Sequence, residues 1–153
     1  MTDMQTIFAD AREHLADAPR EALGREKSSR WRAPRIVRVG AAWHVGVLLI
    51  DDTHVYSVAE VLRAADPGRR GYAAESARER AERRAQALRG GFAEGEVVHI
   101  GWEAVDFDAI ARGEASGPLA LISDVPSVRW SNVGGYIPLE PYLRERIDLL
   151  RGA

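Results

Sequence analysis

Apolar residues near the start of the chain recur at helical spacing. Between residues 4 and 15, the side chains three or four positions apart that share one face are Met4, Ile7, Phe8, Ala11 and Leu15. Thr2 or Asp3 can cap the start of this helix, and Pro19 closes it. The pattern predicts one amphipathic helix in this segment.

The chain then changes to the pattern of a β-meander. Apolar and β-branched residues predict strands at residues 35–39, 43–50 and 54–62. A two-residue turn at Asp51 and Asp52 is expected between the last two strands, which places His44 opposite Ala59. The segment before the meander, residues 24–34, mixes charged residues with turn formers and has no period. It is predicted to be a loop or linker.

The remaining sequence predicts further helices and strands, without the regular helix–strand alternation of a doubly wound fold. A helix is predicted at residues 76–89, with Ser76 and Glu79 as a capping box and a Glu79–Arg83 ion pair one turn apart. Strands are predicted at residues 96–102, 119–122 and 127–130. Asp106 can cap a short helix that ends at Gly113, and Pro141 can start a last helix.

Together these elements predict an α+β fold. We expect a largely antiparallel sheet of about six short strands, with four helices packed mainly on one of its faces. The length of 153 residues suits a single domain, residues 1–153. Within it we expect a helical segment at residues 1–23, a loop or linker at 24–34 and an α+β body at 35–153.

Composition narrows the chemistry. The chain has no cysteine, which excludes disulfides, thiolate metal sites and cysteine nucleophiles. A formal net charge of −2 gives no global attraction to nucleic acid or to anionic lipid. Residues 1–19 lack the pattern of a signal peptide, and the longest apolar stretch is too short to cross a membrane. The sequence thus predicts a cytoplasmic protein without a membrane partner.

Catalytic motifs are missing from the sequence. There is no Gly-x-Ser-x-Gly elbow, no Ser-x-x-Lys pair and no His-Glu-x-x-His metal motif. If the protein is an enzyme, the candidates for catalysis are His99, His44 and Tyr56. The alternative, which we favour, is that these histidines are hydrogen-bonded strand residues. No metal site and no cofactor is predicted.

Two places are candidates for binding a small anion. Arg69 and Arg70 lie between glycines on a loop before a helix, and paired guanidinium groups suit phosphate or carboxylate. Arg129, Trp130 and Tyr136 surround the Gly134-Gly135 loop, where aromatic side chains can line a pocket. The alternatives are a solvated turn at the first place and a sealed core edge at the second.

Residues 20–40 carry a local charge of +5, and Trp31 lies among their arginines. Such a basic, aromatic segment can grip nucleic acid, and the candidate contacts are Arg30, Trp31, Arg32 and Arg35. Residues 91–124 carry a local charge of −6. The favoured interpretation is that the two segments pair with each other, within one chain or between the chains of a homodimer, so nucleic acid is not the first choice of partner.

Four stretches carry a resemblance to a known family: residues 89–95 (RGGFAEG), 97–102 (VVHIGW), 117–121 (GPLAL) and 128–131 (VRWS). In them the chain resembles a family of short bacterial proteins, some of which carry an automatic glutaminase label. That label implies an amidohydrolase. The known serine glutaminases use Ser-x-x-Lys and the amidotransferase type uses cysteine, and both are absent here.

The sequence has a complete set of folding signals and no recognisable catalytic set. We therefore favour a non-catalytic module that binds a partner or a second copy of itself. The alternatives are a small amidohydrolase, as the family label implies, and a nucleic-acid-binding protein that uses residues 25–38.

Overall fold

The computed structural model describes residues 3–66 and 74–152, and the chain forms two compact units. Unit 1 comprises Met1–Arg20, Ala42–Val58 and Glu103–Ala153, and unit 2 comprises Glu21–Ala41 and Ala59–Trp102. The long strand β2 (Arg32–Val45) starts in unit 2 and ends in unit 1. The single domain expected from the length stays a prediction.

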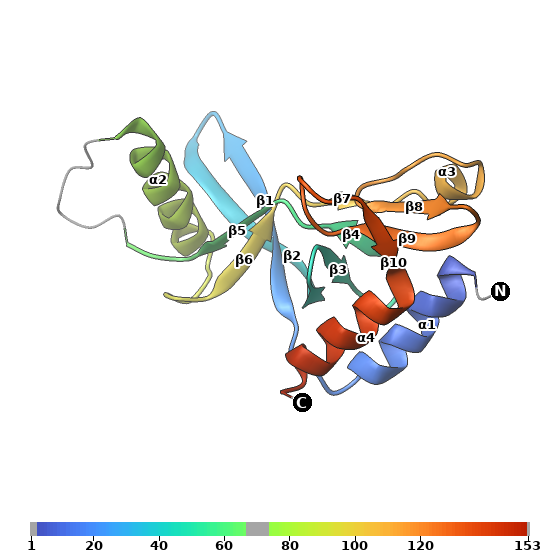
Figure 1. The fold of residues 1–153 in the computed structure, drawn as a ribbon. Coiled ribbons are helices and arrows are strands. Elements are labelled where there is room, and N and C mark those ends of the chain that lie inside the picture. Colours follow the sequence, from blue (N-terminus) through green and yellow to red (C-terminus); the bar gives the residue numbers. More distant parts are fainter. Residues whose placement is uncertain (1–2, 67–73, 153) are drawn as a thin grey trace. The chain divides into compact units, whose positions relative to one another are not determined.

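Unit 1 combines helices with two groups of antiparallel strands (Figure 1). Its described helices are α1 (Met4–Leu15), α3 (Phe107–Ala111) and α4 (Leu139–Leu150). The end of β2 pairs with β3 (Leu48–Ile50), followed by β4 (Val55–Ser57) and β7 (Glu103–Ala104). The second group is β8 (Leu119–Ile122), β9 (Val125–Arg129) and β10 (Tyr136–Pro138).

The core of unit 1 lies where α1 and α4 pack together and α4 contacts β9 and β10 (Figure 1). The apolar face predicted for α1 is buried as expected, and Asp3 caps the helix by accepting a hydrogen bond from the Thr6 N–H. Asp106 caps α3 in the same way, through the Ala109 N–H. Both caps satisfy backbone donors that a helix start leaves unpaired.

Unit 2 contains β1 (Glu21–Ser29), the first part of β2, β5 (Glu60–Arg63), α2 (Glu75–Arg89) and β6 (Val97–Ile100). The strand order is β5-β6-β1-β2, in which β6 runs parallel to β1 and antiparallel to β5. Helix α2 packs against β5. The core joins apolar residues of these elements, among them Ile36, Leu62, Phe92 and Val98.

The α+β class and the four helices are confirmed in the described residues, but the sheet differs from the prediction. Hydrogen bonds link β5-β6-β1-β2-β3-β4-β7 in a mixed seven-stranded sheet, and β10-β9-β8 form a separate three-stranded one. The parallel pair β1–β6 joins segments far apart in sequence, which the patterns of single strands do not report.

Several predicted elements are wrong. Residues 24–34 are not a loop or linker: residues 24–29 belong to β1, residues 32–34 belong to β2, and residues 30–31 form the tight turn between them. The strand expected at residues 43–50 is a hairpin, because Gly46 adopts φ +61° and starts a two-residue turn with Val47. Because of this turn, His44 lies opposite Leu49 and not opposite Ala59. The next connection spans residues 51–54, and across it Leu49 lies opposite Tyr56.

The predicted capping box of α2 is also wrong. The helix begins one residue before Ser76, Ala74 takes the cap position, and no side chain caps it. Arg83 pairs with Glu60 of β5 instead of with Glu79, with 2.6 Å between Nε and Oε2. The helix therefore uses this arginine to bind the sheet, a tertiary contact that local spacing cannot show.

Candidate nucleic-acid interface

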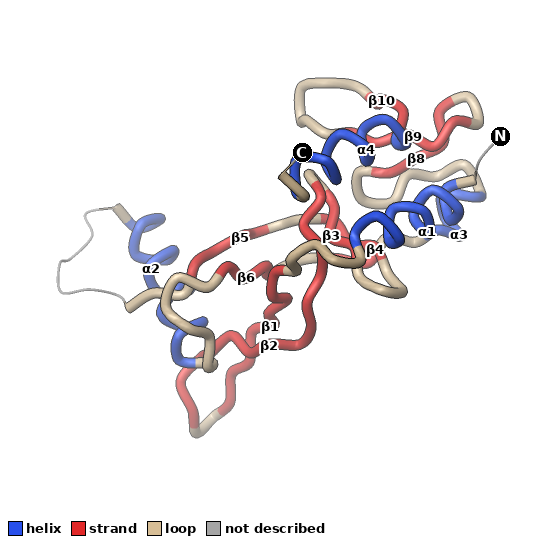
Figure 2. Tube along the Cα trace, turned by 90° about the horizontal axis from the view of Figure 1, so that it is seen from below, coloured by secondary structure: helices blue, strands red, loops and turns tan. Residues whose placement is uncertain are grey.

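The β1–β2 hairpin extends beyond the core of unit 2. Residues 22–24 are buried, whereas residues 25–34 are all exposed. Arg30 and Trp31 form the turn between the strands, and Figure 2 shows this turn at the far end of the hairpin. We call residues 25–34 the hairpin tip.

Positive charge is concentrated on and next to the hairpin tip. The cationic residues here are Arg25, Lys27, Arg30, Arg32 and Arg35. In the part of the chain that the structure describes, none of them forms an ion pair with a carboxylate. Glu26 is the one acidic residue between them. The tip therefore keeps a surplus of positive charge facing solvent.

Within the described chain, residues 20–40 and residues 91–124 pair to only a small extent, and their pairing between the chains of a homodimer stays a prediction. Among the described residues, Arg38 pairs with Glu96 across the two segments, and His99 contacts Glu21, an acidic residue of the basic segment. Arg20 pairs instead with Asp52, at 2.7 Å, and Asp106 serves as a helix cap. In the described chain, no carboxylate of the acidic segment forms an ion pair with a cation of the hairpin tip.

Among the large apolar side chains that the structure describes as exposed, Trp31 is the most exposed aromatic one, with 87% of its surface accessible. It has no hydrogen bond and no ring contact within the described chain. Arg30 and Arg32 are its chain neighbours. An exposed indole whose chain neighbours are both exposed arginines offers a face on which a base can stack, next to two side chains that can bind phosphate.

Arg129, Trp130 and Tyr136 all lie in unit 1, but Tyr136 does not line the hollow that Arg129 and Trp130 share. Arg129 and Tyr136 lie opposite each other on β9 and β10. Arg129 and Trp130 line an open hollow of about 660 Å³ together with Ser57. Binding of an anion there stays a prediction. Arg69 and Arg70, the other candidates for an anion, lie outside the described residues.

The three candidates for catalysis have structural partners. His99 of β6 is fully buried, and its Nε2 lies 2.8 Å from Oε1 of Glu21 on the adjacent strand. His44 Nε2 lies 3.0 Å from the Gly46 carbonyl oxygen in a part-buried position of unit 1. Glu21 Oε1 and His99 Nε2 are both atoms of the kind that ligate metal ions.

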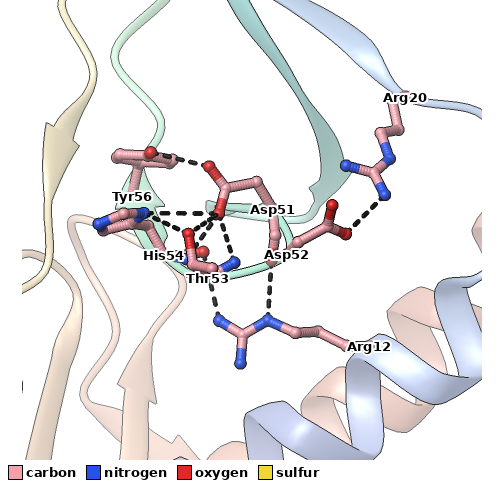
Figure 3. A network of polar contacts seen from close by, with 7 residues as sticks. All are labelled: Arg12, Arg20, Asp51, Asp52, Thr53, His54 and Tyr56. Atoms are coloured by element: carbon pink, nitrogen blue, oxygen red, sulfur yellow. Dashed lines mark hydrogen bonds and ion pairs between the residues drawn. The ribbon is translucent and has the colours of Figure 1, made fainter.

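Tyr56 belongs to a polar network around the β3–β4 loop (Figure 3). Its hydroxyl donates to Asp51 Oδ2 at 2.8 Å, while Asp51 Oδ1 accepts from the Thr53 and His54 N–H groups. Arg12 of α1 donates to the Asp51 and His54 carbonyl oxygens. The network holds the loop closed and ties it to the helix.

The same network brings a hydroxyl, an imidazole and a carboxylate together, but not as a catalytic triad. Thr53 Oγ1 and Asp51 Oδ1 both approach Nδ1 of His54, at 2.7 and 3.7 Å. A triad needs the ring to bridge the two groups through its two different nitrogens. The ring also stacks on Tyr56, and the loop is exposed. The arrangement therefore stabilises a turn.

Burial and hydrogen bonds shift the pKa values of two groups in this network, Asp51 and Tyr56. Burial raises the pKa of the Asp51 carboxyl, but the Thr53 and His54 N–H groups and the Tyr56 hydroxyl bind its ionised form and lower the pKa overall. Burial and the adjacent carboxylate raise the pKa of Tyr56 to about 12. Tyr56 therefore stays protonated at neutral pH and can donate its hydrogen bond to Asp51.

We expect Asp51→Ala to lower the free energy of unfolding by about 1–2 kcal/mol at pH 7, because it removes the acceptor of several loop hydrogen bonds. The folded pKa lies below the ordinary value of 3.8, so this stabilisation is complete above that pH and is lost as pH falls through the folded pKa. Urea unfolding at a series of pH values measures both effects.

The matched control is Asp52→Ala, which removes the neighbouring carboxylate and its exposed ion pair with Arg20. Surface pairs contribute about 0–1 kcal/mol, so this variant should unfold close to wild type. Equal losses in the two variants, or a loss in Asp51→Ala that persists at the lowest pH, would contradict the role given to Asp51.

The sequence reasoning missed the surroundings of Trp102. Its indole Nε1 donates to the Gly24 carbonyl oxygen at 3.1 Å, and the Arg25 guanidinium lies 5.6 Å from the ring centroid. These residues are 78 positions apart, so the contact depends on the parallel pairing of β1 with β6. An aromatic residue at the end of a predicted strand was the available signal.

Comparison with family models, curated proteins and solved structures gives no match to this chain. Among the described helices, none has the length and apolar character required to cross a lipid bilayer.

Proposed function

We propose that the protein is a non-catalytic binding module whose β1–β2 hairpin holds single-stranded nucleic acid. The observation that carries the proposal is Trp31, exposed at the turn between Arg30 and Arg32. Cations bind the phosphates, and the indole stacks on an unpaired base. A base inside a duplex has both faces covered by its neighbours, so the exposed ring favours a single strand.

The charge distribution supports the same partner. The whole chain has a net charge of −2, so attraction of a polyanion depends on the local surplus at the hairpin tip. Such attraction falls off within about 10 Å at 0.1 M salt. Binding should therefore be confined to this surface and should weaken steeply as salt is added.

Two other functions are less well supported. The amidohydrolase implied by the family resemblance needs an activated nucleophile, and the candidates His99, His44 and Tyr56 are hydrogen-bonded in structural roles. Self-association as a homodimer could also cover an exposed tryptophan and arginines, which are frequent at protein interfaces. Such an interface does not need five uncompensated cations on one hairpin.

Fluorescence anisotropy with labelled 12-nucleotide dT and rU strands tests the proposal. Each phosphate neutralised on a single strand changes the slope of log affinity against log salt by about −0.7, so five cations allow a slope of at most about −3.5. We expect Arg30→Gln with Arg32→Gln to reduce this slope by about 1.4. Trp31→Ala should weaken binding about 5- to 100-fold and leave the slope unchanged.

Two variants provide matched controls. Val133→Ala removes another highly exposed apolar side chain, and Arg80→Gln removes another exposed arginine of unit 2; neither should change the affinity. The absence of salt-sensitive binding to both strands would overturn the proposal, and so would tighter binding of a 12-base-pair duplex. A third outcome would identify a self-association surface instead: the wild-type protein binds no nucleic acid, and light scattering shows a dimer that Trp31→Ala dissociates.

A further inference from the structure

A hollow of about 390 Å³ lies in unit 2 at the base of the hairpin tip. It is lined by Gly24, Arg25, Glu26, Glu60, Ile100, Gly101 and Trp102. Arg25 and Glu26 are also the first two residues of the hairpin tip. A strand bound along the hairpin would thus pass the opening of this hollow.

Two flat side chains define one side of the hollow. The hydrogen bond from Trp102 Nε1 to the Gly24 carbonyl oxygen holds the indole in a fixed orientation. The Arg25 guanidinium faces the ring at 5.6 Å from its centroid. Aromatic rings and guanidinium planes are the surfaces on which proteins stack the unpaired bases of single strands.

The charge of the hollow differs from that of the hairpin tip. Two carboxylates, Glu26 and Glu60, accompany the single cation Arg25. Glu60 Oε2 accepts from Arg83, and Glu26 has no partner among the described residues. Carboxylates accept hydrogen bonds and repel phosphate. The hollow therefore suits a neutral ring with N–H donors, whereas the hairpin tip suits the phosphates.

Among the nucleobases, guanine presents two adjacent donors, N1–H and the N2 amino group, on its Watson–Crick edge. Adenine and cytosine place an acceptor beside their amino group, and uracil has a single N–H between two carbonyl groups. A carboxylate can accept both guanine donors at once, and hydrogen bonds to a charged acceptor are the stronger ones. We propose that this hollow binds one guanine base of the strand held by the hairpin; the inference rests on the proposed function.

The test compares three labelled octanucleotides by anisotropy: rU8, the same strand with one central guanosine, and the same strand with inosine there. We expect the guanosine strand to bind wild-type protein about 10- to 100-fold more tightly than rU8, the range typical of a good bidentate base contact. Inosine lacks the N2 amino group and should fall between them. Glu26→Gln with Glu60→Gln should abolish the preference and retain binding of rU8.

The matched control is Glu79→Gln with Glu94→Gln, which makes the same change of charge at two exposed positions of unit 2 outside the hollow. It should keep the guanosine preference. Equal binding of all three strands by wild type would overturn the guanine site and leave the hairpin function standing. A preference that survives in Glu26→Gln with Glu60→Gln would also overturn it. Failure of every strand to bind would count against the proposed function itself.

Discussion

Gly90→Ala is expected to destabilise unit 2 by about 3 kcal/mol or more, at the upper end of the cost of overpacking. Gly90 ends α2, and a Cβ at this position would lie 1.6 Å from the carbonyl oxygen of Ile36. That oxygen belongs to the backbone, and the Ile36 side chain is fully buried. Neither group can move aside without separating α2 from β2.

Two other glycines separate this clash from the general effect of an added methyl group. Gly91→Ala meets no atom within 4 Å but has φ +105°, so we expect a strain of about 1–2 kcal/mol. Gly135→Ala meets no atom and has no such φ, and should unfold within about 0.5 kcal/mol of wild type. Urea unfolding ranks the three variants. Similar midpoints for Gly90→Ala and Gly135→Ala would refute the predicted clash.

The same substitution bears on function, because β1 and β2 carry the hairpin tip and belong to unit 2. Gly90→Ala should therefore lose nucleic-acid binding at the denaturant concentration or temperature where unit 2 unfolds. Retention of binding above that transition would mean that the hairpin does not need the packing of α2.

Local signals were sufficient for most helices. The apolar face of α1 repeats at helical spacing, and Asp3 and Asp106 mark the starts of α1 and α3. These features depend on residues three or four positions apart, which a sequence displays directly. The start of α2 was misplaced because Ser76 and Glu79 have cap-forming spacing, while the helix begins at Glu75 without a side-chain cap.

The hairpin tip shows why strands outside a core are difficult to predict. Residues 25–34 alternate between two solvated faces, so they have no hydrophobic period. Their strand conformation comes from backbone pairing between β1 and β2. The residue types still indicated the chemistry, since Arg30, Trp31, Arg32 and Arg35 were identified from charge and aromatic content. Their placement at an exposed turn came from the structure.

Contacts between distant residues account for the remaining errors and omissions. The hollow beside Trp102 exists because Ala22 pairs with Val98 and Leu23 with His99 in parallel strands. Such pairing has a register that no local pattern determines. The absence of ion pairs at the hairpin tip in the described chain could not be predicted either. Residues 91–124 contain enough carboxylates to pair with every cation of the tip, and the sequence does not show which pairs form.

Phe8→Ala is expected to destabilise unit 1 by about 3–5 kcal/mol, the range for removing a buried aromatic ring. Phe8 is fully buried on the inner face of α1. Its ring meets Phe107 of α3 edge to face, with centroids 5.7 Å apart and planes inclined at 70°. The substitution removes this contact and leaves a cavity among well-packed neighbours. Such a loss is a large share of the 5–15 kcal/mol typical of a folded domain.

The control for Phe8→Ala is Leu149→Ala, which removes an apolar side chain that is 58% exposed on α4 and should stay within about 0.5 kcal/mol of wild type. Below its own unfolding transition, Phe8→Ala should bind single strands as wild type does, because the hairpin tip and its cations belong to unit 2. Calorimetry and anisotropy on the same samples measure both quantities. Binding that is lost while the variant is still folded would show that unit 1 takes part in holding the strand.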